Sequence, residues 1–88
     1  MSQMSERAIA QHEAIAESVH EVNGRWVVAR WNEDEQHWEA PMRPEMRRIT
    51  GAQGIYSREL SDVLSHGYSY TRQSRAVVRA AYVYGLEV

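Results

Sequence analysis

The chain has 88 residues, a net charge of −2 and 43% hydrophobic residues, so it can form one small globular core and no second one. It has no cysteine, which excludes disulfides, thiolate metal ligands and a cysteine nucleophile. No apolar run approaches the roughly 20 residues that a membrane-spanning helix needs, and no basic region followed by an apolar stretch marks a signal peptide. We therefore expect a single soluble, cytoplasmic domain over residues 1–88, with no membrane partner.

All ten basic residues are arginine, and tryptophan and tyrosine occur without phenylalanine. Lysine and phenylalanine have AT-rich codons, so this bias indicates a GC-rich bacterial or phage genome. Arginine also binds carboxylates and phosphates in a bidentate manner, which is a functional alternative. Residues 1–42 contain three arginines and eight acidic residues, whereas residues 43–88 contain seven arginines and four acidic residues. This asymmetry predicts either internal pairing or two separate contact surfaces.

The first segment, within residues 1–24, has the periodicity of an amphipathic helix over residues 5–22. Ser5 is a candidate N-cap, and Asn23-Gly24 can end the helix. Its apolar face comprises Ala8, Ile9, Ile15, Ala16, Val19 and Val22, with His12 among them. Asn23-Gly24 is also a typical hairpin turn, so a hairpin between residues 18–22 and 25–29 is the alternative. The length of the helical pattern favours the helix.

Residues 25–41 predict a two-stranded antiparallel hairpin that is rich in tryptophan. The first half alternates with period two, a polar Glu-Asp-Glu-Gln loop follows, and the chain returns as a second strand. Symmetric closure of this loop pairs Trp31 with Trp38 and Arg30 with Glu39, and both are favourable cross-strand pairs. Two strands alone are marginally stable, so the hairpin should pack on a helix or pair with a second subunit in a homodimer.

The helical part, residues 44–88, is predicted to contain three helices that each end near a glycine. The first covers residues 44–50, because Pro44 suits the first helical position. The second covers residues 58–65 and the third residues 72–84, with Ser57 and Thr71 as caps. The expected fold is therefore α+β: an N-terminal helix, a two-stranded hairpin, and three helices.

The third of these helices carries a stripe of arginines at Arg72, Arg75 and Arg79. No acidic residue lies on that helix, and like charges at this spacing repel by roughly a few tenths of a kcal/mol per pair. A solvated face, the chain's own acidic residues, phosphates or an acidic protein surface could each balance the stripe. The candidate contact set adds neighbouring residues and a second arginine group: Arg72, Gln73, Arg75, Arg79, Tyr82, Arg43, Arg47 and Arg48.

A second candidate interface combines the acidic and aromatic residues of the first half. Glu13, Glu17 and Glu21 are spaced i, i+4, i+8 without basic partners, which indicates either a solvated face or a surface for a basic partner. The hairpin is too short to bury three tryptophans, and an exposed tryptophan would anchor an interface. The set comprises Glu13, Glu17, Glu21, Trp26, Trp31 and Trp38.

No pattern in the sequence indicates catalysis, a metal site or a cofactor. The four histidines are scattered and show no HxxxH or HExxH spacing. Glu39 and Asp62 have no partner visible in the sequence, and the segment from Gly51 to Gly54 lacks the spacing of a phosphate-binding loop. We therefore expect no catalytic residues, no metal, no cofactor and no enzymatic activity.

The predicted helices of residues 58–65 and 72–84 carry residues typical of a helix-turn-helix motif. Glu59-Leu60 opens the first helix of the motif and Gly67 falls in its turn. Ser74-Arg75-Ala76 lies on the recognition helix, and Gly85-Leu86 follows it. Residues 44–88 thus resemble the helix-turn-helix part of winged-helix DNA-binding domains, although Gln73 stands where that motif usually has an apolar residue. The resemblance implies that Arg72, Gln73, Arg75 and Arg79 face the major groove of DNA or its phosphates.

Two functions from different classes are therefore expected. The first is a non-enzymatic binding protein that acts by occupying a surface of a larger protein or protein–nucleic acid complex. In a GC-rich phage or mobile element, such a protein would be an anti-CRISPR-like inhibitor of a host machine in the bacterial cytoplasm. The alternative is a helix-turn-helix transcriptional regulator that binds DNA through residues 72–84.

Overall fold

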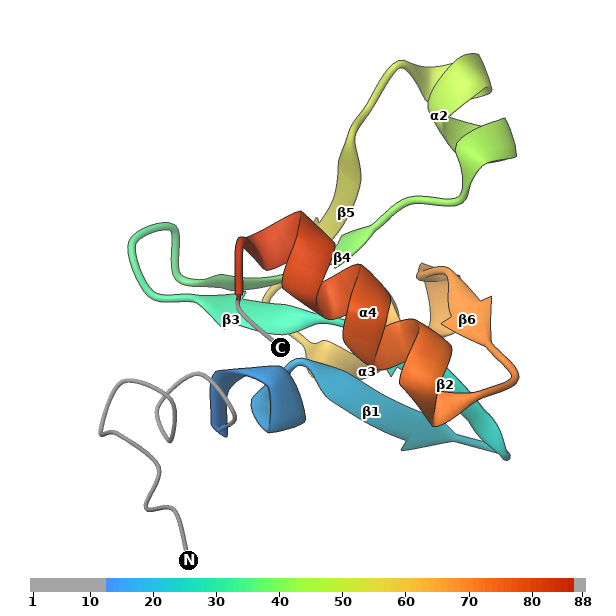
Figure 1. The fold of residues 1–88 in the computed structure, drawn as a ribbon. Helices are drawn as coiled ribbons and strands as arrows, with labels where there is room; N and C mark the ends of the chain where they lie inside the picture. The colour runs from blue at the N-terminus through green and yellow to red at the C-terminus, as the bar shows by residue number, and fades with distance from the viewer. Residues whose placement is uncertain (1–12, 87–88) are drawn as a thin grey trace, which may run out of the picture.

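The computed structural model describes residues 13–86, which form an α+β fold with two three-stranded antiparallel sheets (Figure 1). The strand orders are β1-β2-β6 and β3-β4-β5. The strands are β1 (Val19–Val22), β2 (Arg25–Val28), β3 (Arg30–Asn32), β4 (His37–Pro41), β5 (Gly54–Ser57) and β6 (Ser69–Tyr70). The helices are a short one at residues 13–17, α2 (Pro44–Thr50), α3 (Leu60–His66) and α4 (Gln73–Tyr84).

The predicted α+β class agrees with the structure, but the predicted architecture with a single two-stranded hairpin is wrong. A helix was expected over residues 5–22, of which the structure describes residues 13–22. Only residues 13–17 of these are helical, and β1 follows them. Residues 5–12, which include the expected cap and part of the apolar face, lie outside the described residues. The alternative hairpin around Asn23-Gly24 is the one that forms, pairing Val19 with Val28.

The turn between β1 and β2 explains why the hairpin forms instead of the helix. Asn23 and Gly24 have φ angles of 52° and 78°, and a two-residue type I′ turn requires positive φ at both central positions. Pairing also places the half-buried Val19 beside the buried Val28, where α4 covers both. Tertiary packing on β2 therefore overrides the helical periodicity of this segment.

The first strand of the predicted Trp-rich hairpin is interrupted at Ala29, which separates β2 from β3. Ala29 is fully buried, and its N–H donates a hydrogen bond to the Ser18 carbonyl at 3.0 Å. The His20 imidazole Nε2 donates to the Ala29 carbonyl, also at 3.0 Å. Since both backbone groups of Ala29 bond outside the sheet ladders, the chain passes from one sheet to the other at this residue.

The predicted register of the hairpin is confirmed in β3 and β4. Trp31 pairs with Trp38 and Arg30 pairs with Glu39. The two indole rings lie 5.7 Å apart at an angle of 67°, which is a favourable edge-to-face arrangement. Two further strands were not predicted: β5 pairs with β4, and β6 pairs with β2.

The three predicted helices of the second half are present within two residues of their expected ends. α2 begins at Pro44 and is followed by Gly51, whose φ of 75° is typical of a glycine that ends a helix. The expected caps of α3 and α4 are wrong. Glu59 and Arg72 occupy the N-cap positions without a side-chain cap hydrogen bond, and the Ser57 hydroxyl instead donates to the Asp62 carboxylate at 2.9 Å.

Among the described residues, two small apolar clusters hold the fold together, one under α4 and the other under α3. α4 packs on β2 through a cluster of Val28, Ala76 and Ala80. α3 packs on β4 and β5, and its Val63 forms the second cluster with Ala29 and Ala40. The core face of α4 therefore includes Ala76, which is fully buried.

Gly67 lies where α3 and both sheets meet, and it has no room for a side chain. A Cβ atom added there would lie 2.8 Å from the Val63 carbonyl oxygen, 3.1 Å from Val27 Cγ1 and 3.2 Å from Ala40 Cβ. The first of these contacts is with backbone, which cannot move aside without displacing α3. Glycine at this position thus permits the close approach of β2, β4 and the end of α3.

We expect Gly67→Ala to lower the free energy of unfolding by about 1–3 kcal/mol, because the added methyl group overpacks the junction. Urea denaturation followed by tryptophan fluorescence measures this change. The control is Arg58→Ala, an exposed position, which should change the free energy by less than about 0.5 kcal/mol. Equal urea midpoints for Gly67→Ala and the wild type would contradict the proposed close packing.

Candidate functional site

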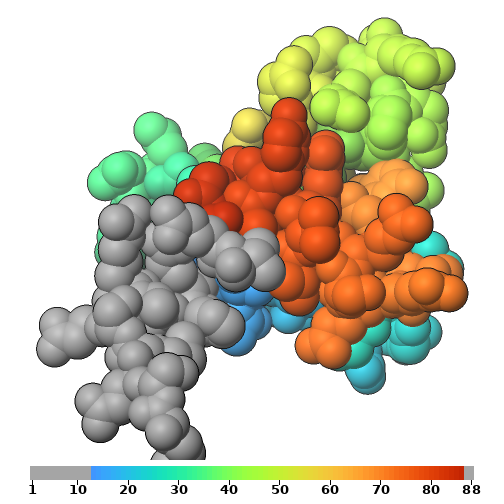
Figure 2. All heavy atoms as spheres, viewed as in Figure 1, coloured from blue at the N-terminus to red at the C-terminus, as the bar shows by residue number. Residues whose placement is uncertain are grey.

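A hollow of about 620 Å³ lies between α4, the β4–β5 pair and α2. Figure 2 shows the notch between α4 and α2 on this face of the molecule. Its charged and aromatic lining comprises three arginines, three tyrosines and one glutamate: Arg30, Arg47, Arg79, Tyr56, Tyr82, Tyr84 and Glu39. Residues of β4, α2 and β5 thus face the C-terminal half of α4 across a hollow that is lined by arginine and tyrosine side chains.

Two further hollows continue from the first along the same side of α4. A hollow of about 220 Å³ shares Pro41, Arg47 and Arg79 with the first and adds Tyr68 and Tyr70. A hollow of about 440 Å³ shares both of these tyrosines and adds further arginines at the start of α4 and on β2. We call the combined lining the Arg–Tyr surface: Arg25, Arg30, Arg47, Arg72, Arg75, Arg79, Tyr56, Tyr68, Tyr70, Tyr82 and Tyr84.

The composition of the Arg–Tyr surface is unusual for this chain. It contains six of the ten arginines and all five tyrosines. Glu39 is the one carboxylate among the described residues that line the three hollows. A protein with a net charge of −2 therefore has one strongly basic face.

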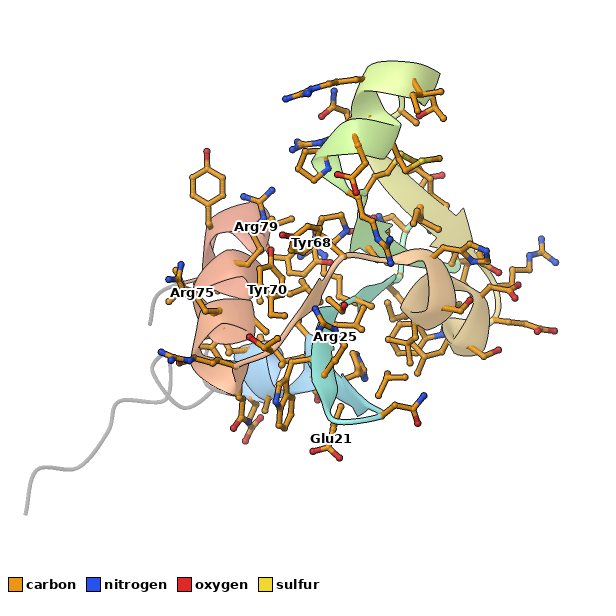
Figure 3. The ribbon with its side chains drawn as sticks, turned by 90° about the vertical axis from the view of Figure 1, so that its right-hand side faces the viewer. Glu21, Arg25, Tyr68, Tyr70, Arg75 and Arg79 are labelled. Carbon is orange, nitrogen blue, oxygen red and sulfur yellow. The ribbon has the colours of Figure 1, made fainter. Side chains whose placement is uncertain are left out.

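Strand β6 and the segment just before it place two tyrosines, Tyr70 and Tyr68, in the middle of this surface. The pairing of β6 with β2 places Tyr70 opposite Trp26, and the rings of Tyr68 and Tyr70 lie 4.7 Å apart. Figure 3 shows both tyrosines between Arg25 of β2 and the arginines of α4. Arg25 is held there because its Nε donates to the Ser69 hydroxyl at 2.7 Å.

At the other end of the surface, Arg30, Glu39 and Tyr84 form one connected unit. Arg30 Nε donates to Glu39 Oε1 at 2.8 Å, and the guanidinium carbon lies 4.2 Å from the centroid of the Tyr84 ring. The Tyr84 hydroxyl donates to the Glu39 carbonyl oxygen at 3.3 Å. Burial raises the pKa of the Tyr84 hydroxyl well above its ordinary value near 10, and the Glu39 carboxylate raises it further.

The tyrosines of the surface divide into two kinds. Tyr68, Tyr70 and Tyr84 are half-buried, and the last two pack against the core under α4. Tyr82 is 79% exposed and Tyr56 is 56% exposed, and both rings border the first hollow. The Arg79 guanidinium lies 5.5 Å from the centroid of the Tyr82 ring, so a cation and an accessible aromatic face lie next to each other.

The structure brings together some of the arginines singled out in the sequence and separates others. Arg79 of the stripe and Arg47 of the second arginine group line the same two hollows. Arg43 lines a different, apolar hollow beside Met46 and Ile55. The remaining predicted contact residues are exposed but border none of the three hollows of the Arg–Tyr surface: Arg48 on α2 and Gln73 on α4.

The predicted acidic stripe does not form a single helical face. Glu13 and Glu17 lie on the helix of residues 13–17, whereas Glu21 lies on β1, and all three are exposed. Figure 3 shows Glu21 at the far end of the hairpin from the arginines of α4. Within residues 13–86, the ion pair that forms is between Arg30 and Glu39. Glu13, Glu17 and Glu21 therefore do not neutralise the arginines of α4.

The three tryptophans have different environments. Trp26 packs against the cluster under α4, and Trp38 packs against the cluster under α3. Trp31 is 37% exposed, and its indole N–H donates to the Glu33 carboxylate at 2.8 Å. Trp31 is therefore the tryptophan left at the surface, where its ring meets the ring of Trp38 edge to face.

Sequence reasoning missed Arg25, Arg30 and four of the tyrosines of the surface. They come from β2, β3, β5, the region of β6, and α4, which are spread over residues 25–84 of the chain. The available signal was the alternation in Tyr-Ser-Tyr, which places two tyrosines on one side of an extended segment. In Tyr-Val-Tyr, on the last helix, the same spacing points the two rings in different directions. Only the folded arrangement shows that both segments border the same hollows.

No protein-family model, curated protein or solved structure matches this chain. The winged-helix resemblance of residues 44–88 therefore stays a prediction. Among the described residues, no three His, Asp or Glu side chains form a group that could hold a metal ion. No helix in the described part of the chain is long and apolar enough to cross a membrane.

We expect the free energy of unfolding to fall as the pH rises above about 10, partly because of Tyr84. The unfolded chain releases the phenolic proton near pH 10, whereas the folded protein holds it to higher pH. Between these pKa values the folded state binds more protons, and Tyr84 contributes a loss of up to about 1.4 kcal/mol per pH unit.

Urea denaturation at about pH 8 and about pH 11 tests this contribution in the variant Tyr84→Phe. The variant should lose about 0.5–1.5 kcal/mol at the lower pH through its missing hydrogen bond, and it should show a smaller loss between the two pH values. Tyr82→Phe, at an exposed position, should keep the pH dependence of the wild type. Identical pH dependence in Tyr84→Phe and the wild type would contradict the assignment.

Proposed function

We propose that this protein is a non-enzymatic binding protein that occupies an anionic surface of a larger protein or protein–nucleic acid complex. The observation that carries the proposal is the Arg–Tyr surface, where six arginines line continuous hollows with a single carboxylate. That carboxylate, Glu39, already pairs with Arg30. The other arginines are thus placed to contact anions supplied by a partner.

The charge distribution supports this role. Arg72, Arg75 and Arg79 repel one another along α4, and Arg47 lines the same hollows as Arg79. Within the described residues, none of these four guanidinium groups forms an ion pair with a carboxylate. A partner's carboxylates or phosphates would relieve the repulsion through bidentate hydrogen bonds.

The biological role proposed on this basis is inhibition of a bacterial host machine by a protein of a phage or mobile element, in the manner of anti-CRISPR proteins. Two features of the chain support that role: its small size, and its use of arginine without any lysine, which suits a GC-rich genome. Such an inhibitor acts in the cytoplasm by covering a surface that the host machine needs. Covering a surface requires contact residues and no catalytic group.

A second candidate function is DNA binding by α4, as a helix-turn-helix regulator would use it. The observation that favours it is the exposure of Arg72, Gln73 and Arg75 at the start of this helix. In this proposal the beginning of α4 contacts the major groove or its phosphates. Duplex binding that depends on these residues distinguishes it from the first proposal.

Affinity capture from a bacterial lysate tests the first proposal. We expect the immobilised wild-type protein to retain a defined complex, and we expect Arg47→Ala/Arg79→Ala to retain at least about tenfold less, because one charge-assisted hydrogen bond contributes about 1.5–3 kcal/mol. The matched control is Arg48→Ala/Arg58→Ala, which removes two exposed arginines outside the Arg–Tyr surface. Equal retention by both double variants, or none by the wild type, would overturn the proposal.

A further inference from the structure

We infer that the Arg–Tyr surface binds a single-stranded nucleic acid, with phosphates on its arginines and bases stacked on its exposed tyrosines. This inference rests on the proposed function and names the anionic part of the partner. Proteins that bind single strands combine a basic groove with aromatic side chains, because each base offers a face for stacking. The three connected hollows provide both components on one side of the molecule.

The aromatic residues distinguish a nucleic acid from an acidic protein surface as the occupant. Arginines alone would satisfy a patch of carboxylates. An exposed ring next to a cation, as Tyr82 is next to Arg79, additionally offers a face on which an unpaired base can stack. Tyr82 and Tyr56 expose most of their area at the border of the first hollow. They are the two rings on which unpaired bases can stack.

The other three tyrosines build the walls of the path. Tyr84 is held by its hydrogen bond to the Glu39 carbonyl and by the Arg30 guanidinium over its ring. Tyr70 packs against the core under α4, and the ring of Tyr68 contacts it. These three rings are therefore held in place, while Tyr56 and Tyr82 project at the border.

The shape of the surface favours a single strand over a duplex. Arg79 of α4 and Arg47 of α2 line the same two hollows, so these two helices form opposite walls of the hollows. Figure 1 shows α2 on an arm that rises beside α4. A helix that reads duplex DNA must enter a major groove about 12 Å wide, and a second helix alongside hinders that entry. A single strand needs only the space between the two walls.

The arginines have different roles along this path. Arg30 is paired with Glu39, and Arg25 is bonded to the hydroxyl and carbonyl of Ser69. The guanidinium groups left for phosphates are those of α2 and α4: Arg47, Arg72, Arg75 and Arg79. This division predicts which substitutions change the salt dependence of binding.

Fluorescence anisotropy of a fluorescein-labelled oligothymidylate, titrated with the protein at several salt concentrations, tests the inference. The logarithm of the association constant should fall linearly with the logarithm of salt concentration. Each arginine that contacts a phosphate contributes about 0.7 to this slope, so Arg47→Ala/Arg79→Ala should reduce its magnitude by about 1.4. The control Arg48→Ala/Arg58→Ala should keep most of the wild-type slope and affinity.

A tyrosine series tests base stacking separately from charge. Tyr82→Leu should weaken oligothymidylate binding by about tenfold without changing the salt slope, because it removes a stacking ring and no cation. Tyr82→Phe keeps the ring and should bind as the wild type does. The side chain is 79% exposed, so both variants should fold, and circular dichroism confirms this before binding is measured.

The inference is overturned if the oligothymidylate does not bind at low salt, or if Tyr82→Leu binds it as tightly as the wild type. It is also overturned if a duplex of equal length binds more tightly than the single strand, which would favour the regulator instead. Capture of a complex from nuclease-treated lysate separates this inference from the proposed function. Arginine-dependent capture without oligothymidylate binding leaves an acidic protein surface as the partner, whereas failure of both experiments removes both proposals.

Discussion

The passage of one strand between two sheets at Ala29 is the constraint on which the rest of the fold depends. A backbone that leaves both ladders must find other partners, and Ser18 and His20 supply them at 3.0 Å each. The space around the crossing is small, so the neighbouring positions are Ala40 and Gly67. Small side chains at the crossing let β2 and β4 lie close together, while each sheet packs against a helix of its own: α4 on β2, and α3 on β4 and β5.

The same crossing determines where the Arg–Tyr surface lies. Gly67 ends α3 at the junction and leads directly into Tyr68, whose N–H donates to the Pro41 carbonyl, and into Tyr70, which β6 holds against β2. On the other sheet, β4 carries Glu39 to the hydroxyl of Tyr84 at the end of α4. One wall of the surface is therefore tied to the core through both sheets. The opposite wall, α2, buries no residue and depends for its position on the pairing of β4 with β5.

Sequence patterns predicted the features that depend on neighbouring residues. The register of Trp31 with Trp38 follows from a symmetric loop, and the glycines after the helices mark their ends. The patterns failed where packing between distant segments decides the structure. Val19 and Val22 fit a helical face as well as a strand, and packing on β2 selects the strand. β5 and β6 are too short to show alternation, and most of the tyrosines of the candidate site could not be predicted because they meet only after both strands have paired.

The grouping of arginines is informative in a way that their number is not. Codon usage in a GC-rich genome accounts for arginine in place of lysine at any position. It does not account for a fold that places Arg47 and Arg79 on opposite walls of the same hollows and borders those hollows with all five tyrosines. The acidic residues Glu13, Glu17 and Glu21 lie elsewhere on the surface, so the positive potential of this face is not cancelled by them. Such a separation of charge orients an approaching anionic partner toward the Arg–Tyr surface and makes the rate of association depend on salt.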